Sequence, residues 1–237
     1  MERKQFLRYM GAALGWVAIG PLLTACDGDG DSTTTTDTTV PPATTVPPAT
    51  TVPPATTTPP PATTLSAEEI AGLKFMREEE KLAHDVYVAL YGVWGDNIFY
   101  QISLSETTHT EAVLALLVKY GIEDPAAGNP AGVFTDPALQ SLYDTLVNMG
   151  YASQIDALKV GALIEETDIR DIKAKIAVTD EADILTVYNS LLCGSQDHLR
   201  AFNSQLLALG VVYVPQAITQ AMWDAIANSP AGTCVAV

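Results

Sequence analysis

The 237-residue chain is poor in basic, aromatic and cysteine residues. It has 12 lysines and arginines against 28 aspartates and glutamates, a formal net charge of −16. A nucleic-acid binder needs enough basic residues to neutralise a track of phosphates, so this composition argues against that class. Three cysteines are too few for a disulfide scaffold. No segment alternates apolar and polar residues for long enough to predict a β-sheet.

The N-terminus has the pattern of an export signal. Arg3, Lys4 and Arg8 precede a small, apolar stretch over residues 11–23. At roughly 13 residues, this stretch is shorter than the ~20 that a membrane-spanning helix needs. The run from Arg3 to Arg8 looks like a twin-arginine export motif with lysine in its second basic place, and general secretion is the alternative route.

The apolar stretch ends at Leu23-Thr24-Ala25-Cys26, which resembles the lipobox of bacterial lipoproteins. That resemblance implies that residues 1–25 are a removed signal peptide and that Cys26 is lipidated. It predicts an exported lipoprotein anchored on the periplasmic or extracellular face of a membrane. An ordinary cleaved signal with an incidental cysteine is the alternative.

Residues 26–64 are predicted to be a disordered tether. Thr-Val-Pro-Pro-Ala-Thr recurs between Thr39 and Thr56, and the paired prolines exclude helix. As polyproline II, at ~3.1 Å per residue, the segment is a semi-rigid spacer of about 100 Å.

The domain proper is predicted over residues 65–237, and its patterns are helical. Ser66 and Glu69 have the spacing of a capping box, and apolar residues then recur at three- and four-residue steps to about Tyr91. Similar patterns predict long helices over 97–120, 153–177 and 181–209, and short ones over 138–148 and 215–228. Two helical hairpins joined across residues 121–152 predict an all-α four-helix bundle with one long crossover connection and a short C-terminal helix.

Polar residues interrupt the core face of each long helix. Glu106 and His109 share the core face of the second helix. The other candidates are Glu79 or Glu80 on the first helix, Glu165 on the third and His198 on the fourth. If the hairpins turn near residues 94 and 179, these side chains meet at roughly the same height in the bundle.

Carboxylates buried without a partner cost several kcal/mol each, so such a cluster needs cations. Carboxylate oxygens combined with imidazoles suit iron or manganese and, less selectively, zinc. The i, i+3 spacing of Glu106 and His109 aims both donors at one ion or at two neighbouring ions.

Four motifs occur in the order of a known family. They begin at Glu78, Ser105, Ile164 and Ser195, and read EEEKLAHDVY, SETTH, IEETDI and SQDHLRAF. Together they resemble the ferritin-like domain family DUF2202 over about residues 65–228. Ferritin-like proteins in general are di-iron or di-manganese carboxylate proteins that react with dioxygen or peroxide, store iron or oxidise organic substrates. The resemblance implies a ferritin-like bundle with metal ligands Glu80 (or Glu79), Glu106, His109, Glu165 and His198.

The fourth helix departs from the di-metal pattern. That pattern has Glu-x-x-His at this point, whereas this chain has Ser195 three residues before His198. Asp168 or Glu166 is a candidate replacement for the missing carboxylate. Otherwise the site holds one metal, binds the second weakly, or holds none.

The two cysteines that remain beside Cys26 lie at 193 and 234. In an oxidising compartment, Cys193 and Cys234 would form one disulfide that pins the C-terminal tail to the fourth helix. Separate thiols are the alternative.

These observations predict a lipid-anchored, exported domain that binds two iron ions and oxidises ferrous iron or reduces dioxygen or peroxide. The sequence identifies no site for an electron donor. A tethered, non-catalytic binding or structural module with a degenerate or single-metal site is the rival hypothesis, and a metal chaperone or sensor is a third.

Overall fold

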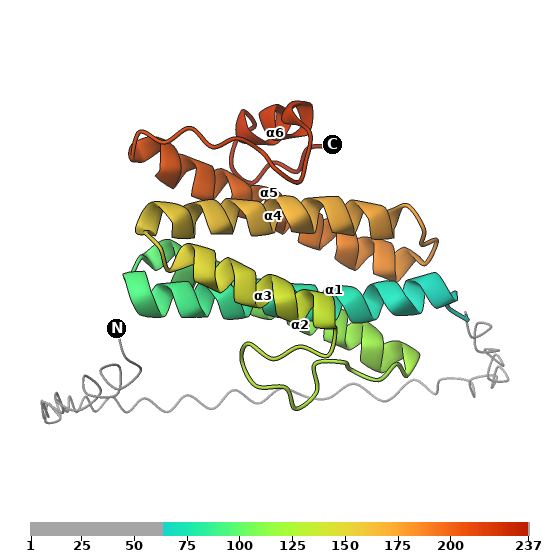
Figure 1. The fold of residues 1–237 in the computed structure, drawn as a ribbon. Coiled ribbons are helices and arrows are strands. Elements are labelled where there is room, and N and C mark those ends of the chain that lie inside the picture. The colour runs from blue at the N-terminus through green and yellow to red at the C-terminus, as the bar shows by residue number, and fades with distance from the viewer. Residues whose placement is uncertain (1–63, 237) are drawn as a thin grey trace, which may run out of the picture. The chain divides into compact units, whose positions relative to one another are not determined.

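The computed structural model describes residues 64–236. The predicted signal peptide, Cys26 and the predicted tether up to residue 63 therefore lie outside the described residues. Within the described part the regular structure is entirely helical, with no strand, which confirms the all-α bundle (Figure 1). None of these helices combines the length and apolar character needed to cross a membrane. The helices are α1 (Ala67–Trp94), α2 (Asn97–Tyr120), α3 (Pro137–Gly150), α4 (Gln154–Ile176), α5 (Ala182–Ala208) and α6 (Gln220–Ala227).

Local capping signals set the first hairpin, formed by α1 and α2. Ser66 and Glu69 make the predicted capping box, in which each side chain accepts a hydrogen bond from the other residue's amide. Gly95 ends α1 with φ of 65°, a left-handed conformation that glycine adopts without a Cβ clash. Asp96 then accepts from the amide of Ile98 and begins α2. This short turn makes α1 and α2 neighbours along their length.

The second hairpin, formed by α4 and α5, packs against the first to complete the bundle. Ser153 begins α4 by accepting from the amide of Asp156, and two lysines in its last turn complement the helix dipole. The connection from α2 to α4 contains α3, which contacts both α1 and α4 and lies along them in Figure 1.

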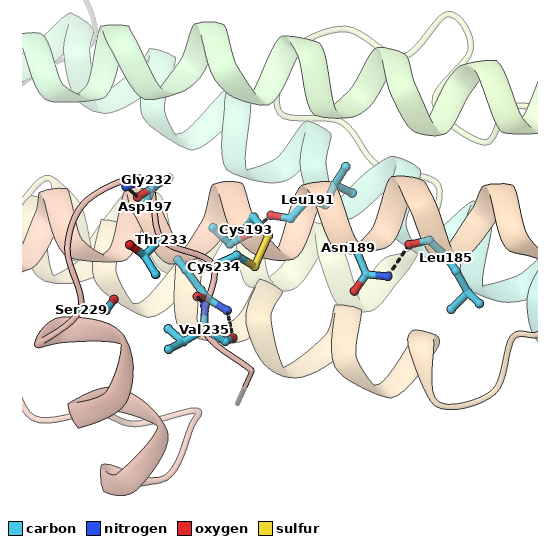
Figure 2. The surroundings of a disulfide bond; sticks show 12 residues. Leu185, Asn189, Leu191, Cys193, Asp197, Ser229, Gly232, Thr233, Cys234 and Val235 are labelled. Carbon is cyan, nitrogen blue, oxygen red and sulfur yellow. Dashed lines mark hydrogen bonds between the residues drawn. A yellow bond between two sulfur atoms is a disulfide. The ribbon is translucent and has the colours of Figure 1, made fainter.

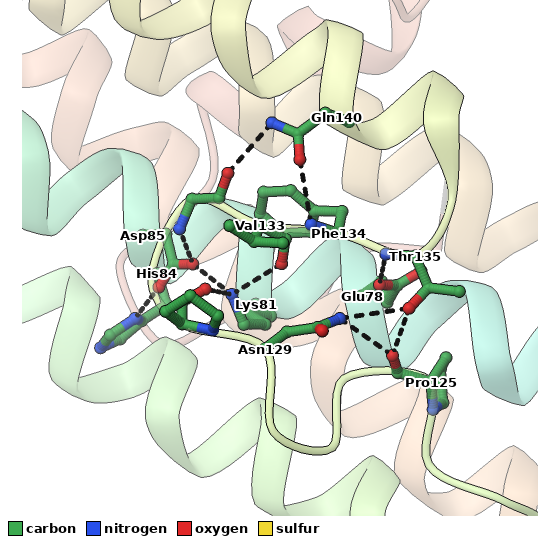
Figure 3. Close-up of polar contacts among 12 residues, drawn as sticks. Glu78, Lys81, His84, Asp85, Pro125, Asn129, Val133, Phe134, Thr135 and Gln140 are labelled. Carbon is green, nitrogen blue, oxygen red and sulfur yellow. Dashed lines mark hydrogen bonds and ion pairs between the residues drawn. The ribbon is translucent and has the colours of Figure 1, made fainter.

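Buried acids of α1 anchor the loop between α2 and α3 (Figure 3). Glu78 is only 2% exposed, and its carboxylate accepts hydrogen bonds from the amides of Thr135 and Asp136. Asp85 accepts from the amide of Gly132 and from Lys81. The long crossover is therefore fixed to the bundle by charge-assisted hydrogen bonds to its backbone.

The C-terminal segment is fixed to α4 and α5. Glu166 of α4 accepts hydrogen bonds from three successive amides, those of residues 216–218. Residues 216–218 form a bend around this carboxylate, and α6 begins at Gln220, with Thr219 as its cap, five residues later than the sequence predicts. A disulfide joins Cys193 to Cys234 (Figure 2). Gln196 exchanges two hydrogen bonds with the backbone of Val235, the residue after Cys234.

An aromatic cluster lies in the bundle core. The rings of Tyr87, Phe99 and Phe202, from α1, α2 and α5, lie 5.5–6.4 Å apart between centroids and are fully buried. The hydroxyl of Tyr87, at the edge of this apolar cluster, donates a hydrogen bond to Glu165 of α4. The same bundle interior therefore holds a dense apolar cluster and, beside it, a layer of buried charged groups.

Candidate metal centre

Five donor residues from four helices meet in the bundle interior. Their helical positions turn each side chain inward, and none is more than 9% exposed. They are Glu80 of α1, Glu106 and His109 of α2, Glu165 of α4 and His198 of α5. The sequence analysis named all five.

The first group consists of Glu80, Glu106 and His109. Nδ1 of His109 lies 2.7 Å from Oε2 of Glu106 and 3.1 Å from Oε2 of Glu80. One ligand atom from each residue lies within 4.8 Å of the others, which is close enough to surround one ion.

The second group consists of Glu106, Glu165 and His198. Nδ1 of His198 lies 2.8 Å from Oε1 of Glu106 and 3.4 Å from Oε2 of Glu165. Glu106 therefore belongs to both groups and turns one carboxylate oxygen toward each imidazole. One carboxylate therefore lies between the two groups of donors.

Several of these buried atoms lack a hydrogen bond. They include Oε1 of Glu80, both oxygens of Glu106, Oε2 of Glu165 and Nδ1 of His198. Some lie under 3 Å from an imidazole nitrogen, so the angle of approach, and not the distance, prevents a hydrogen bond. Atoms that converge in this way fit a shared cation between them, and the residues present therefore suit a metal site.

The buried carboxylates and imidazoles shift one another's pKa values. Burial raises the pKa of Glu80 to about 7, and it raises the pKa of Glu165 as well. Burial opposes ionisation of Glu106 too, but His198 and His109 outweigh it and hold the pKa of Glu106 below its usual range. Burial lowers the pKa of His109, but the carboxylates of Glu106 and Glu80 outweigh burial and raise this pKa to about 10. Glu165 and Glu106 likewise raise the pKa of His198. Without a metal, protons on the imidazoles supply the positive charge.

The family model described as "Uncharacterized protein domain (DUF2202)" matches residues 69–230. The chain belongs to the DUF2202 family. It is 48% identical over 165 residues to "Uncharacterized protein MJ0754" of Methanocaldococcus jannaschii, an alignment that covers 70% of this chain and 89% of that protein. The crystal structure of "hypothetical protein MJ0754 from Methanococcus jannaschii DSM 2661" matches with a TM-score of 0.71 and 46% identity. That match covers 73% of this chain and 99% of the other.

In this DUF2202 chain, hydrogen bonds from outside the donor set orient two of the donors. Nε2 of His198 lies 3.0 Å from Oγ of Ser105, so a proton on Nε2 would be donated to the serine and would leave Nδ1 free for a metal. Tyr87 donates to Oε1 of Glu165 and leaves Oε2 facing His198. The sequence analysis did not single out Ser105 as a partner of His198, although it is the residue before Glu106.

Ser195 does not replace the missing carboxylate of the fourth long helix, α5. It is buried, and its hydroxyl donates to the carbonyl of Leu191 one turn earlier. His198 is therefore the one residue that α5 contributes to the two groups. The centre of this DUF2202 domain has three carboxylates and two imidazoles.

The remaining predicted metal residues, Glu79 and Asp168, lie outside both groups. Each is at most 2% exposed, and both line a cavity between α1, α3 and α4. Burial, followed by the charge of Asp171, raises the pKa of Glu79. Burial, followed by the charges of Glu80 and Glu79, raises the pKa of Asp168. The structure thus places Glu80, and not Glu79, among the grouped donors.

Proposed function

We propose that this DUF2202 domain is a ferritin-like protein with a di-metal carboxylate centre. The observation that carries the proposal is the position of Glu106, whose two oxygens each face a separate group of carboxylate and imidazole donors. Ferritin-like di-iron and di-manganese proteins build such centres from glutamates and Glu-x-x-His pairs on four helices of a bundle. Here Glu106 and His109 form one such pair, and Glu80 and Glu165 are the glutamates on two other helices.

Iron is the metal that we propose, at two ions per chain. The centre offers carboxylate oxygens and imidazole nitrogens and no thiolate, a set that suits iron or manganese and also admits zinc. Glu80 and His109 would hold one ion, Glu165 and His198 the other, and Glu106 both. Two ferrous ions held together would supply the two electrons that reduce dioxygen to hydrogen peroxide, or hydrogen peroxide to water.

The protein residues prepare the site for this chemistry. The side chains of the donors are almost fully buried, so bulk water is excluded and each charge acts in a medium of low polarity. Ser105 fixes the ring of His198, and Tyr87 fixes one oxygen of Glu165. Burial and the neighbouring carboxylates raise the pKa of Tyr87, so its hydroxyl keeps its proton and remains a donor.

The proposed activity is tested by adding ferrous iron to the purified chain under air and measuring the loss of ferrous iron. The expected result is faster oxidation than in buffer, with ferric absorption in the near ultraviolet. Glu106→Gln should abolish the acceleration, whereas Glu111→Gln, at an exposed position of the same helix, should retain it. Equal rates for the unmodified chain and Glu106→Gln would contradict a catalytic centre.

One observation favours a second function, that of a non-catalytic module with a single metal. The serine at 195 leaves the centre one carboxylate short of the full pattern, and its hydroxyl points to the backbone of α5. A single bound ion per chain without accelerated iron oxidation would support this alternative.

We also propose, from residues 1–26, that the chain is exported and lipid-anchored through Cys26. The disulfide between Cys193 and Cys234 supports export, because such bonds persist in oxidising compartments and are rare in the cytosol. Mass spectrometry of the membrane fraction tests this proposal: a diacylglyceryl-modified N-terminal Cys26 is expected, and an unmodified chain in the soluble fraction would contradict it.

A further inference from the structure

A separate cavity of about 170 Å³ lies between α1, α3 and α4. Leucines from all three helices, Leu82, Leu146 and Leu163, contribute to its walls. A cavity of roughly 150 Å³ with similar walls is known to take up benzene, so this one has room for a molecule of about eight non-hydrogen atoms. Arg170 also lines the cavity, and half of its side chain is exposed, so one edge of the cavity reaches solvent.

Two buried carboxylates without hydrogen-bond partners line the same cavity. Both oxygens of Glu79 and Oδ2 of Asp168 lack a hydrogen bond, although the two residues are only 2% and 1% exposed. The nearby carboxylate of Asp171 can share a proton with Glu79, but both of its own oxygens already accept hydrogen bonds from Arg170. Buried polar groups in proteins almost always have a partner. Apart from Thr167 and Arg170, the rest of the wall is apolar, so the unmet acceptors indicate a ligand that carries hydrogen-bond donors.

A metal ion is a poor match for this pair. Among the described residues, the groups of three or more close donors include neither Glu79 nor Asp168. Hard cations need about six oxygen ligands, whereas the rest of this wall is mainly leucine and isoleucine. The nearby cation Arg170 is held by both carboxylate oxygens of Asp171, at 2.7–2.8 Å.

We propose that this cavity binds a small primary amine. Its apolar body would fill the leucine-lined part, and its ammonium group, with three N–H donors, would be held by Glu79 and Asp168. Glu79 precedes Glu80 in α1, and Asp168 lies about one helical turn after Glu165 in α4, so the amine would lie next to the donor groups described above. The proposal does not depend on the metal function, because the cavity is formed by the chain alone.

The test is calorimetric titration of the full chain with benzylamine, toluene and benzyl alcohol, after treatment with chelator. The expected result is saturable binding of one benzylamine per chain, with a dissociation constant at or below about 1 mM. Toluene and benzyl alcohol should bind at least tenfold more weakly. Glu79→Gln and Asp168→Asn should each weaken benzylamine binding at least tenfold, whereas the exposed-site control Glu111→Gln should leave it unchanged.

A further variant separates loss of the cavity from loss of the charges. Leu142→Phe adds volume at a partly exposed wall of α3 and should abolish binding while the thermal unfolding curve stays cooperative. Equal binding of toluene and benzylamine would overturn the proposal, as would benzylamine binding that survives both carboxylate substitutions. Absence of saturable benzylamine binding to the folded chain would overturn it as well.

Discussion

Gly194 of α5 lies directly against the imidazole ring of His109 on α2. A Cβ added at Gly194 would lie 2.6 Å from Nε2 and 2.7 Å from Cε1 of that ring, closer than real contacts allow. Because Gly194 has no side chain, the ring of His109 can pack against α5 with its Nδ1 toward Glu106 and Glu80. The sequence alone gave no sign of this role, because a lone glycine inside a helix has many explanations.

Gly194→Ala should displace the ring of His109 and reduce metal affinity at least tenfold, since a small misplacement of a donor is enough to spoil coordination. Alanine also favours helix by about 0.5–1 kcal/mol over glycine, so a loss of affinity would not come from weaker helix formation. Gly92→Ala in α1, where nothing lies within 4 Å of the added Cβ, is the matched control. Equal metal affinity in both variants, measured by competition with a chelator, would contradict the proposed placement of His109.

Ser105→Ala should lower metal affinity roughly 10–100-fold, because the substitution removes the hydrogen-bond acceptor that orients His198. Ser105→Thr keeps the hydroxyl and should restore most of the affinity. Thr108→Ala, at an exposed position of the same helix, should have no effect. A threonine variant as weak as the alanine variant would show that the hydroxyl is not what positions the imidazole.

The pH dependence of stability should differ between the metal-free and metal-loaded chains. Between about pH 4.5 and 7, the folded metal-free chain holds a proton on Glu80 that the unfolded chain has released, so stability falls as pH rises. His109 has a raised pKa of about 10. The contribution of its proton to the stability of the folded chain is complete below pH 6.5 and is lost as pH rises from 6.5 to about 10. Metal binding requires both groups without protons, so the stabilisation by metal should grow over the same range.

Thermal unfolding of both forms at pH 5, 7 and 9 measures this difference. The melting temperature of the metal-free chain should decrease as pH rises. The difference in melting temperature between the metal-loaded and metal-free chains should therefore increase. A gap that narrows toward pH 9 would contradict the proposed protonation of the donors.

Reduction of the disulfide should destabilise the domain. The bond between Cys193 and Cys234 closes a loop with a sequence separation of 41, for which a loss of about 2–4 kcal/mol is expected. Urea unfolding of Cys193→Ser, Cys234→Ser and the double variant should show the same decrease in each. If reductant leaves the unfolding midpoint of the unmodified chain unchanged, this bond does not stabilise the domain.

The grouped donors could be predicted from the sequence because helical periodicity fixes which residues share a face and hairpin turns fix their height. Periodicity could not separate Glu79 from Glu80, since both neighbours on α1 are buried and they face different spaces in the bundle interior. The partners of Glu78 and Glu166 are backbone amides at least 50 residues away, which no local pattern identifies. For the same reason the start of α6 was predicted five residues too early, at Pro215 and not Gln220.

The most direct test of the central claim is elemental analysis of the full chain, purified without chelator, beside Glu106→Gln and the control Glu111→Gln. If Glu106 bridges two metal positions, about two ions per chain are expected in the unmodified protein and in the control, and Glu106→Gln should lose both or retain them only weakly. No metal above background in the unmodified protein, or two ions that remain tightly bound in Glu106→Gln, would contradict the account.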